Sequence, residues 1–193
     1  RYNAEQIFTL MREADKQGVR VLCLPELCIT GYTCGDLFLQ PTLLRGAEEA
    51  LATILEATKN LDMVTTLGLP VRNKWDNKLY NCAAVIQKGE ILGLVPKACL
   101  PNYGEFYEGR WFTSGAGVDA TVTLCGQEVS LADSNLFACE DMPGLVIGVE
   151  ICEDLWAPEP PSIRLARSGA TLILNLSASN ELAGKAAYRR GLV

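Results

Sequence analysis

The stretch from residue 145 to residue 156, LVIGVEICEDLW, constrains the fold of this chain more than any other. Its first five residues are apolar and partly β-branched, which is typical of a strand buried on both faces in a sheet covered by helices. The polarity then changes abruptly, with carboxylates at positions 150, 153 and 154 around Cys152. Such strand ends are where α/β proteins place their reactive groups. The stretch therefore predicts an α/β fold with a candidate nucleophile at Cys152.

The surroundings of Cys152 limit the chemistry that it can perform. Three neighbouring carboxylates should raise the pKa of the thiol, so we expect a compensating positive charge or a base that removes the proton during attack. The chain has no histidine, which excludes Ser-His-Asp and Cys-His arrangements and histidine-ligated metals. A carboxylate or a lysine must then move the proton. Acyl transfer by cysteine without histidine predicts a Glu/Lys/Cys constellation.

Length and composition set outer bounds. A chain of 193 residues that is 49% hydrophobic can form one domain with its own core. The net charge of -6 argues against nucleic acid or an anionic membrane as partner. No apolar run approaches the roughly 18 residues of a transmembrane helix, and no signal peptide is visible. The eight cysteines include no C-x-x-C pair, so we expect a protein of the reducing cytoplasm with no metal site.

Apolar spacing and turn residues predict three helices and a set of strands, with Glu26, Lys97 and Cys152 each directly after an apolar run. The first residues already lie in a helix, so we expect a segment of a longer protein that lacks its first strand. A strand that ends before Pro70 and a long loop over residues 98–117 are also expected. The remaining elements are a helix from Arg1 to Gly18, a strand at 19–24, a helix after Pro41, hairpins at 80–96 and 120–131, strands at 135–138 and 171–176, and a helix at 162–168. We expect the three strand ends to converge on one face of a sheet.

Three stretches resemble the nitrilase, or carbon-nitrogen hydrolase, superfamily. They are LPELCITGY around Glu26, VPK ending at Lys97 and GVEICEDLW around Cys152. Residues 97–108, 153–156 and 175–179 more closely resemble the N-terminal glutaminase domain of glutamine-dependent NAD synthetases. The resemblance implies a four-layer α-β-β-α sandwich that this chain need not contain in full. It also implies one domain over residues 1–193, truncated at both ends, that hydrolyses glutamine to glutamate and ammonia.

The resemblance also implies roles for individual residues. Glu26 is the general base, and Cys152 forms a glutamyl thioester. Lys97 holds the thiolate and, with a backbone N–H near Cys152, stabilises the tetrahedral oxyanion. Tyr103 lies against the catalytic site. Independently of the resemblance, Glu153 is a candidate to contact and support the catalytic residues. The glutamine pocket is lined by Tyr32, Phe106, Glu108, Trp156, Ser179 and Lys185. Glu108 would bind the α-ammonium of glutamine, and Lys185 with Ser179 its α-carboxylate.

The implied partners lie outside this chain. Ammonia would pass to a C-terminal synthetase domain that uses ATP and magnesium to amidate nicotinic acid adenine dinucleotide, and the chain would form a homo-oligomer. No cofactor is expected in the glutaminase domain itself. Two alternatives stay open, a free-standing amidase or nitrilase-type hydrolase of another small amide, and a catalytically silent domain of the same fold. Under simpler interpretations the aromatic residues after Lys97 pack as a lid, and Glu150, Glu153 and Asp154 are surface charges.

Overall fold

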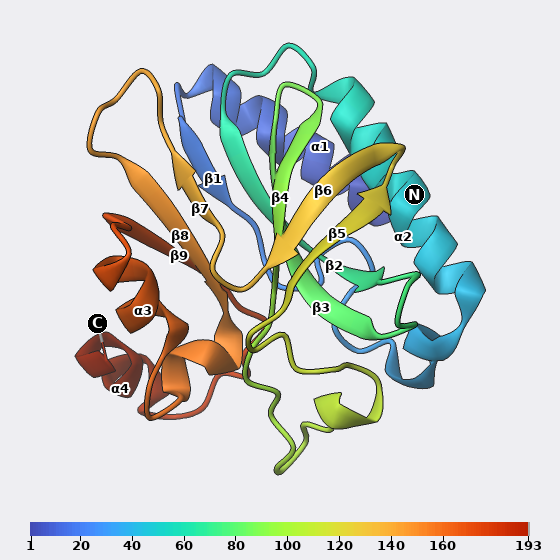
Figure 1. Ribbon diagram of the computed structural model, residues 1–193, viewed down its shortest axis with the longest axis vertical. Helices are drawn as coiled ribbons and strands as arrows, with labels where there is room; N and C mark the ends of the chain where they lie inside the picture. The colour runs from blue at the N-terminus through green and yellow to red at the C-terminus, as the bar shows by residue number, and fades with distance from the viewer. Residues whose placement is uncertain (193) are drawn as a thin grey trace.

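Two β-sheets lie between helices in the computed structural model, which describes residues 1–192 (Figure 1). The larger sheet has the order β1-β2-β3-β4-β6-β5, formed by Val21–Cys23, Val64–Arg72, Leu79–Gln87, Glu90–Pro96, Gln127–Ala132 and Asp119–Leu124. The smaller sheet has the order β7-β8-β9, formed by Leu136–Ala138, Val146–Ile151 and Leu172–Leu176. The helices are α1 (Tyr2–Lys16), α2 (Pro41–Ala57), α3 (Pro161–Arg167) and α4 (Lys185–Leu192), with 3-10 turns η1 (Gly35–Leu39), η2 (Glu108–Arg110) and η3 (Cys152–Trp156).

Helices α1 and α2 cover the outer face of the larger sheet (Figure 1). On α1 the buried residues are Ala4, Ile7 and Met11, which recur at helical spacing. Leu10 belongs to the same predicted stripe but is 55% exposed. Proline at the first position of α2 suits the fixed φ of that residue and starts the helix where the sequence predicts. Within residues 1–192 there is no helix of the length and hydropathy that crossing a membrane requires.

The two predicted hairpins are present, and local sequence explains both turns. Lys88 and Gly89 have φ angles of 51° and 81°, and Cys125 and Gly126 have 51° and 76°. Two consecutive residues with positive φ are the signature of the type I′ turn, whose twist matches that of antiparallel strands. Strand β4 of the first hairpin ends at Pro96, so Lys97 directly follows it.

Strand β2 differs from the prediction because it runs through Pro70 to Arg72. Pro70 pairs in register with Asn81 of β3. On its other edge β2 pairs with β1, but only at residues 64–66. At Pro70 that edge of β2 has no strand beside it among the described residues. Because that side needs no N–H donor there, the strand tolerates a proline. The sequence pattern also did not predict α4, which has no buried residue to mark it.

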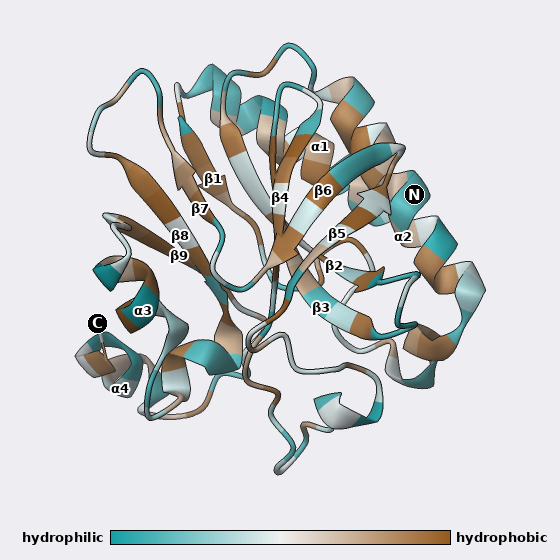
Figure 2. Cartoon of the chain, viewed as in Figure 1, coloured by the Kyte–Doolittle hydropathy of each residue, from teal (hydrophilic) through white to brown (hydrophobic). Residues whose placement is uncertain are grey.

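Strand β8 is buried on both faces, as its apolar run predicts. Ile147, Val149 and Ile151 belong to the core between the sheets, together with Ala83 and Val85 of β3. On the opposite face, a Cβ at Gly148 would lie 3.2 Å from Cβ of Leu165 in α3, so α3 packs closely on this strand. Strands β8 and β9 are largely brown, the colour of apolar residues, in Figure 2.

Candidate active site

The predicted triad assembles where strand ends of the two sheets meet. Glu26 lies in a turn after β1, Lys97 follows β4, and Cys152 begins η3 after β8. They are 2%, 1% and 6% exposed, respectively. The prediction of a single sheet face is wrong, because β8 belongs to the smaller sheet while β1 and β4 belong to the larger one. Packing between sheets, not one strand ladder, therefore brings the nucleophile to the other two residues.

The Glu26 carboxylate is held by three hydrogen-bond donors from distant segments. Its Oε1 accepts from Lys97 Nζ at 2.7 Å and from Asn81 Nδ2 at 2.8 Å. Its Oε2 accepts from the backbone N–H of Ala178 at 3.0 Å. Burial alone would lower the pKa of Lys97, but the Coulomb attraction of Glu26 and Glu108 outweighs it and raises the pKa overall. The site thus contains a permanent ammonium group.

Glu108 lies within this cluster, where its Oε1 accepts from Lys97 Nζ at 2.6 Å and from the Tyr32 hydroxyl at 2.7 Å. Burial is the largest cause of a raised pKa at Glu108, and the nearby Lys97 opposes the shift. Burial and the adjacent Glu108 also raise the pKa of Tyr32, so this phenol stays a donor. Glu108 Oε2 is buried and has no hydrogen-bond partner within the described residues. The structure thus places Glu108 beside Lys97 of the predicted triad.

Cys152 adopts a φ of 48°, a left-handed conformation that is uncommon for residues other than glycine. Burial, with a further contribution from Glu26, raises the pKa of its thiol to about 11. Lys97 and the Ser177 hydroxyl oppose this shift. The residue is therefore a thiol at neutral pH, and it needs a base at the moment of attack. Glu26 is close enough to act on it electrostatically and is the candidate for that base.

The three acidic residues around Cys152 are not the source of this shift. Glu150 is buried and accepts from Ser162 N–H at 3.0 Å and from Asn175 Nδ2 at 3.2 Å. Asp154 is also buried and accepts from backbone N–H groups. Glu153 accepts from the Tyr103 hydroxyl at 2.8 Å. The surface-charge interpretation is therefore wrong for Glu150 and Asp154, because each faces donors inside the protein.

The turn that carries Glu26 requires a glycine on the neighbouring strand. A Cβ at Gly68 of β2 would lie 2.1 Å from the backbone nitrogen of Leu27 and 2.7 Å from the carbonyl carbon of Glu26. No real Cβ tolerates such contacts, so a side chain at this position would displace Glu26. The apolar run of β2 contains no signal for this role.

The predicted substrate residues form two groups. In the first, Phe106 packs edge-on against Tyr32 and Tyr103, with ring centroids 6.3 Å and 5.8 Å apart. In the second, Lys185 Nζ donates to Ser179 Oγ at 2.5 Å and lies 5.3 Å from the Trp156 ring centroid. Lys185 also donates to Asn180, whose side-chain amide donates to Glu105. This last contact links the long loop after Lys97 to the segment after β9.

Three contributors to the site escaped the sequence interpretation. Asn81 could have been recognised from the sequence, because it is a polar residue within the buried apolar run of β3. A buried amide in a strand must find partners, and this one finds Glu26. Ala178 contributes through its backbone N–H, which no side-chain pattern reveals. Asp154 was noticed, but it was interpreted as a surface charge.

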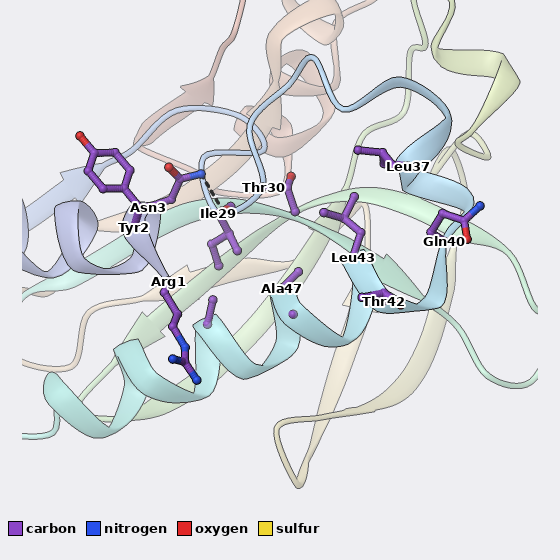
Figure 3. A pocket seen from close by; sticks show the side chains of 12 residues that line it. Arg1, Tyr2, Asn3, Ile29, Thr30, Leu37, Gln40, Thr42, Leu43 and Ala47 are labelled. Carbon is purple, nitrogen blue, oxygen red and sulfur yellow. Dashed lines mark hydrogen bonds between the residues drawn. The ribbon is translucent and has the colours of Figure 1, made fainter.

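A separate hollow of about 480 Å³ lies between the start of α1, the segment after β1 and α2 (Figure 3). Its lining is largely apolar, with Ile29, Leu43 and Ala47 among its residues. The Asn3 side chain donates to the Ile29 carbonyl at 3.0 Å at the edge formed by α1. None of the triad residues lines this hollow, so the candidate active site is defined by its reactive groups.

Residues 1–189 match the carbon-nitrogen hydrolase family. The chain belongs to this family. It is 40% identical over 188 residues to the glutamine-dependent NAD(+) synthetase of Mycobacterium tuberculosis, covering 97% of this chain and 27% of that protein. This carbon-nitrogen hydrolase chain thus spans less than a third of that relative.

Solved structures agree with the family assignment. The glutamine-dependent NAD(+) synthetase of Cytophaga hutchinsonii matches with a TM-score of 0.84 and 36% identity, over 99% of this chain and 30% of that one. An amidase from Nesterenkonia matches with a TM-score of 0.63 and 20% identity, over 93% of this chain and 60% of that one. The second likeness concerns the fold alone. The mixed α/β fold with two sheets is therefore that of solved carbon-nitrogen hydrolases.

Proposed function

We propose that this carbon-nitrogen hydrolase chain is a glutaminase that releases ammonia from glutamine for the synthesis of NAD. The observation that carries the proposal is the buried cluster of Glu26 and Lys97 beside Cys152. Similarity to glutamine-dependent NAD(+) synthetases supports glutamine as the substrate. Those relatives are more than three times as long as the matched segment. Their similarity favours a further synthetase domain, dependent on ATP and magnesium, as the acceptor of the ammonia.

The geometry supports a two-step acyl transfer. The Cys152 thiol attacks the carboxamide carbon while Glu26 accepts its proton. Lys97 and a backbone N–H near Cys152 stabilise the oxyanion of the tetrahedral intermediate. Glu26 then returns the proton to the leaving nitrogen, so that ammonia departs and a thioester remains. In the second step Glu26 activates water, which attacks the thioester, and the Cys152 thiol re-forms as glutamate leaves.

We assign Glu108 to this cluster in preference to the α-ammonium of glutamine. Its bonds to Lys97 and Tyr32 favour a role in orienting the ammonium of the lysine. Its unpartnered Oε2 can accept an N–H of the substrate carboxamide. Lys97 is thereby held between two carboxylates, which fixes its position before the substrate arrives.

The group of Ser179, Lys185 and Trp156 is suited to the α-carboxylate end of glutamine. Lys185 supplies a positive charge, and the Ser179 hydroxyl supplies a further donor. A lysine is a point charge without the two-pronged geometry of arginine. Phe106, Tyr32 and Tyr103 would then form the opposite wall of the pocket.

Lys185→Ala is expected to raise the KM for glutamine about tenfold while kcat changes less than about twofold. The substitution removes an interaction that is equally strong in the ground state and the transition state, because the α-carboxylate does not react. Steady-state kinetics of glutamate release test this. Arg189→Ala is the matched control, because it removes another cation of α4, one that pairs with Glu181 at 3.6 Å. A loss confined to kcat in Lys185→Ala would place this residue outside the pocket.

Covalent trapping tests the proposed function as a whole. The protein is exposed to an electrophilic diazoketone analogue of glutamine, and the adduct is mapped by peptide mass spectrometry. We expect a single adduct on Cys152 that excess glutamine prevents. Labelling spread over several cysteines, or labelling that glutamine does not reduce, would contradict a glutamine site. It would favour the two alternatives, a hydrolase of another small amide or a silent domain.

We further propose that the two sheets and their helices are the layers of an α-β-β-α sandwich. Helices α1 and α2 pack on the larger sheet, and α3 packs on β8 of the smaller one. A cytoplasmic homo-oligomer is the assembly we propose, in keeping with the family resemblance.

A further inference from the structure

Asp154 is a buried carboxylate, 2% exposed, with all its hydrogen bonds to backbone groups. Its Oδ1 accepts from the N–H groups of Ala98 at 3.1 Å and Cys99 at 2.7 Å. Its Oδ2 accepts from the N–H of Ile151 at 2.8 Å. One side chain thus binds two chain segments that are more than 50 residues apart in the sequence.

The donors are the neighbours of two catalytic residues. Ala98 directly follows Lys97, and Ile151 directly precedes Cys152. Strand β4, which ends just before Lys97, belongs to the larger sheet, and β8, which ends just before Cys152, belongs to the smaller one. Because no shared ladder sets their register, the spacing between the two residues depends on contacts across the sheets.

We propose that Asp154 is a positioning residue that fixes the backbone of Lys97 against the backbone of Cys152. The inference rests on the proposed function, in which Lys97 must stabilise charge on and near the Cys152 sulfur. An error of about 1 Å in such a placement can cost about a hundredfold in rate. Holding Ile151 also restrains the left-handed backbone of Cys152, which has a φ of 48°.

The chemistry of the contact requires a carboxylate at position 154. Three N–H donors meet two oxygens, and an ionised carboxylate accepts at both oxygens. An asparagine of the same shape would turn an NH₂ group toward at least one of these donors. Burial raises the pKa of Asp154 to about 6, so the group is ionised at neutral pH and keeps its accepting capacity.

Glu150 provides a matched comparison. It is a buried carboxylate on the same segment, with two hydrogen bonds where Asp154 has three, and its donors are Ser162 in α3 and Asn175 in β9. Neither donor adjoins Lys97 or Cys152 in the sequence. A merely structural role for Asp154 would make the two carboxylates equivalent in their effect on the thiol.

The test compares Asp154→Asn, Glu150→Gln and the wild type by alkylation of Cys152 with iodoacetamide, quantified by peptide mass spectrometry from pH 7 to 10. Thermal unfolding is recorded in parallel. We expect both variants to melt at lower temperature. In Asp154→Asn alone, alkylation of Cys152 should slow about tenfold and the apparent pKa from its pH profile should rise, because Lys97 is no longer held in place. Glu150→Gln should stay within about twofold of the wild-type rate.

Equal alkylation in Asp154→Asn and the wild type, or equal slowing in both variants, would overturn the positioning role. If Asp154→Asn does not fold, Asp154→Glu replaces it, since it keeps the charge but moves both oxygens by one methylene. Slowing in that variant supports the role, and a wild-type rate overturns it. Iodoacetamide reports on the thiol without glutamine. If glutamine fails to protect Cys152 in the trapping experiment while Asp154→Asn still slows alkylation, the substrate proposal is wrong and the positioning role stands.

Discussion

Cys152→Ala is expected to reduce glutamine hydrolysis by about 10⁴-fold or more, because no other group in the cluster can form the thioester. The fold should change little. The substitution removes one sulfur atom from a residue that is 6% exposed, at a cost on the order of 1 kcal/mol. Ammonia release measures the first effect, and thermal unfolding measures the second.

Cys125→Ala is the control for this substitution. Cys125 is also a free cysteine with a left-handed backbone, at a φ of 51°, but it lies in the turn of the β5-β6 hairpin. We expect wild-type hydrolysis from this variant and a similar small change in unfolding temperature. Turnover of Cys152→Ala at the wild-type rate would refute the thioester mechanism.

Lys97→Met is expected to abolish hydrolysis and to destabilise the protein by about 3–5 kcal/mol. The lysine side chain is fully buried between Glu26 and Glu108, and methionine of similar length leaves these carboxylates without their cation. For a protein of this size the loss corresponds to a fall of about 10 °C in Tm. Chemical and thermal unfolding at pH 7 measure it.

The pH dependence of Lys97→Met supplies a second readout. Burial already raises the pKa of Glu108, and the variant loses the lysine that lowers it. A carboxyl group whose pKa is higher in the folded state binds protons preferentially there, so stability increases as the pH falls. We expect Lys97→Met to regain part of its stability between pH 7 and pH 5.

Lys88→Met serves as the control for Lys97→Met. Lys88 pairs with Asp62 at 2.7 Å on the surface, where its side chain is 62% exposed. Exposed pairs of this kind contribute at most about 1 kcal/mol. If both substitutions lower the free energy of unfolding equally, burying Glu26 and Glu108 without their cation carries no special cost.

The sequence predicts those elements of the fold that depend on neighbouring residues, such as turns and buried strands. The hairpin turns at Lys88-Gly89 and Cys125-Gly126 depend on residues that accept positive φ. The β8 run could be recognised because burial on both faces demands continuous apolar residues. Pro70 was misjudged for a non-local reason, since tolerance of a proline depends on whether another strand needs its N–H group.

The amino-acid sequence alone predicts that Cys152 is a nucleophile in a Glu/Lys/Cys constellation. The absence of histidine and the positions of Glu26, Lys97 and Cys152 after apolar runs predicted the cluster that the structure brings together. Residue identity and local pattern suffice for this, because strand ends are where such groups project.

The hydrogen-bond partner of each polar group depends on the tertiary structure. In the folded chain Glu108 accepts a hydrogen bond from Lys97, and Asn81 donates one to Glu26. Asp154 accepts from the backbone N–H next to Lys97. These contacts join segments from two sheets, and a buried polar group bonds to whatever donor packing brings within about 3 Å. Sequence periodicity reports which face of an element is buried, but not what lies opposite it. The hydrogen bonds that hold the site therefore follow from how the two sheets pack.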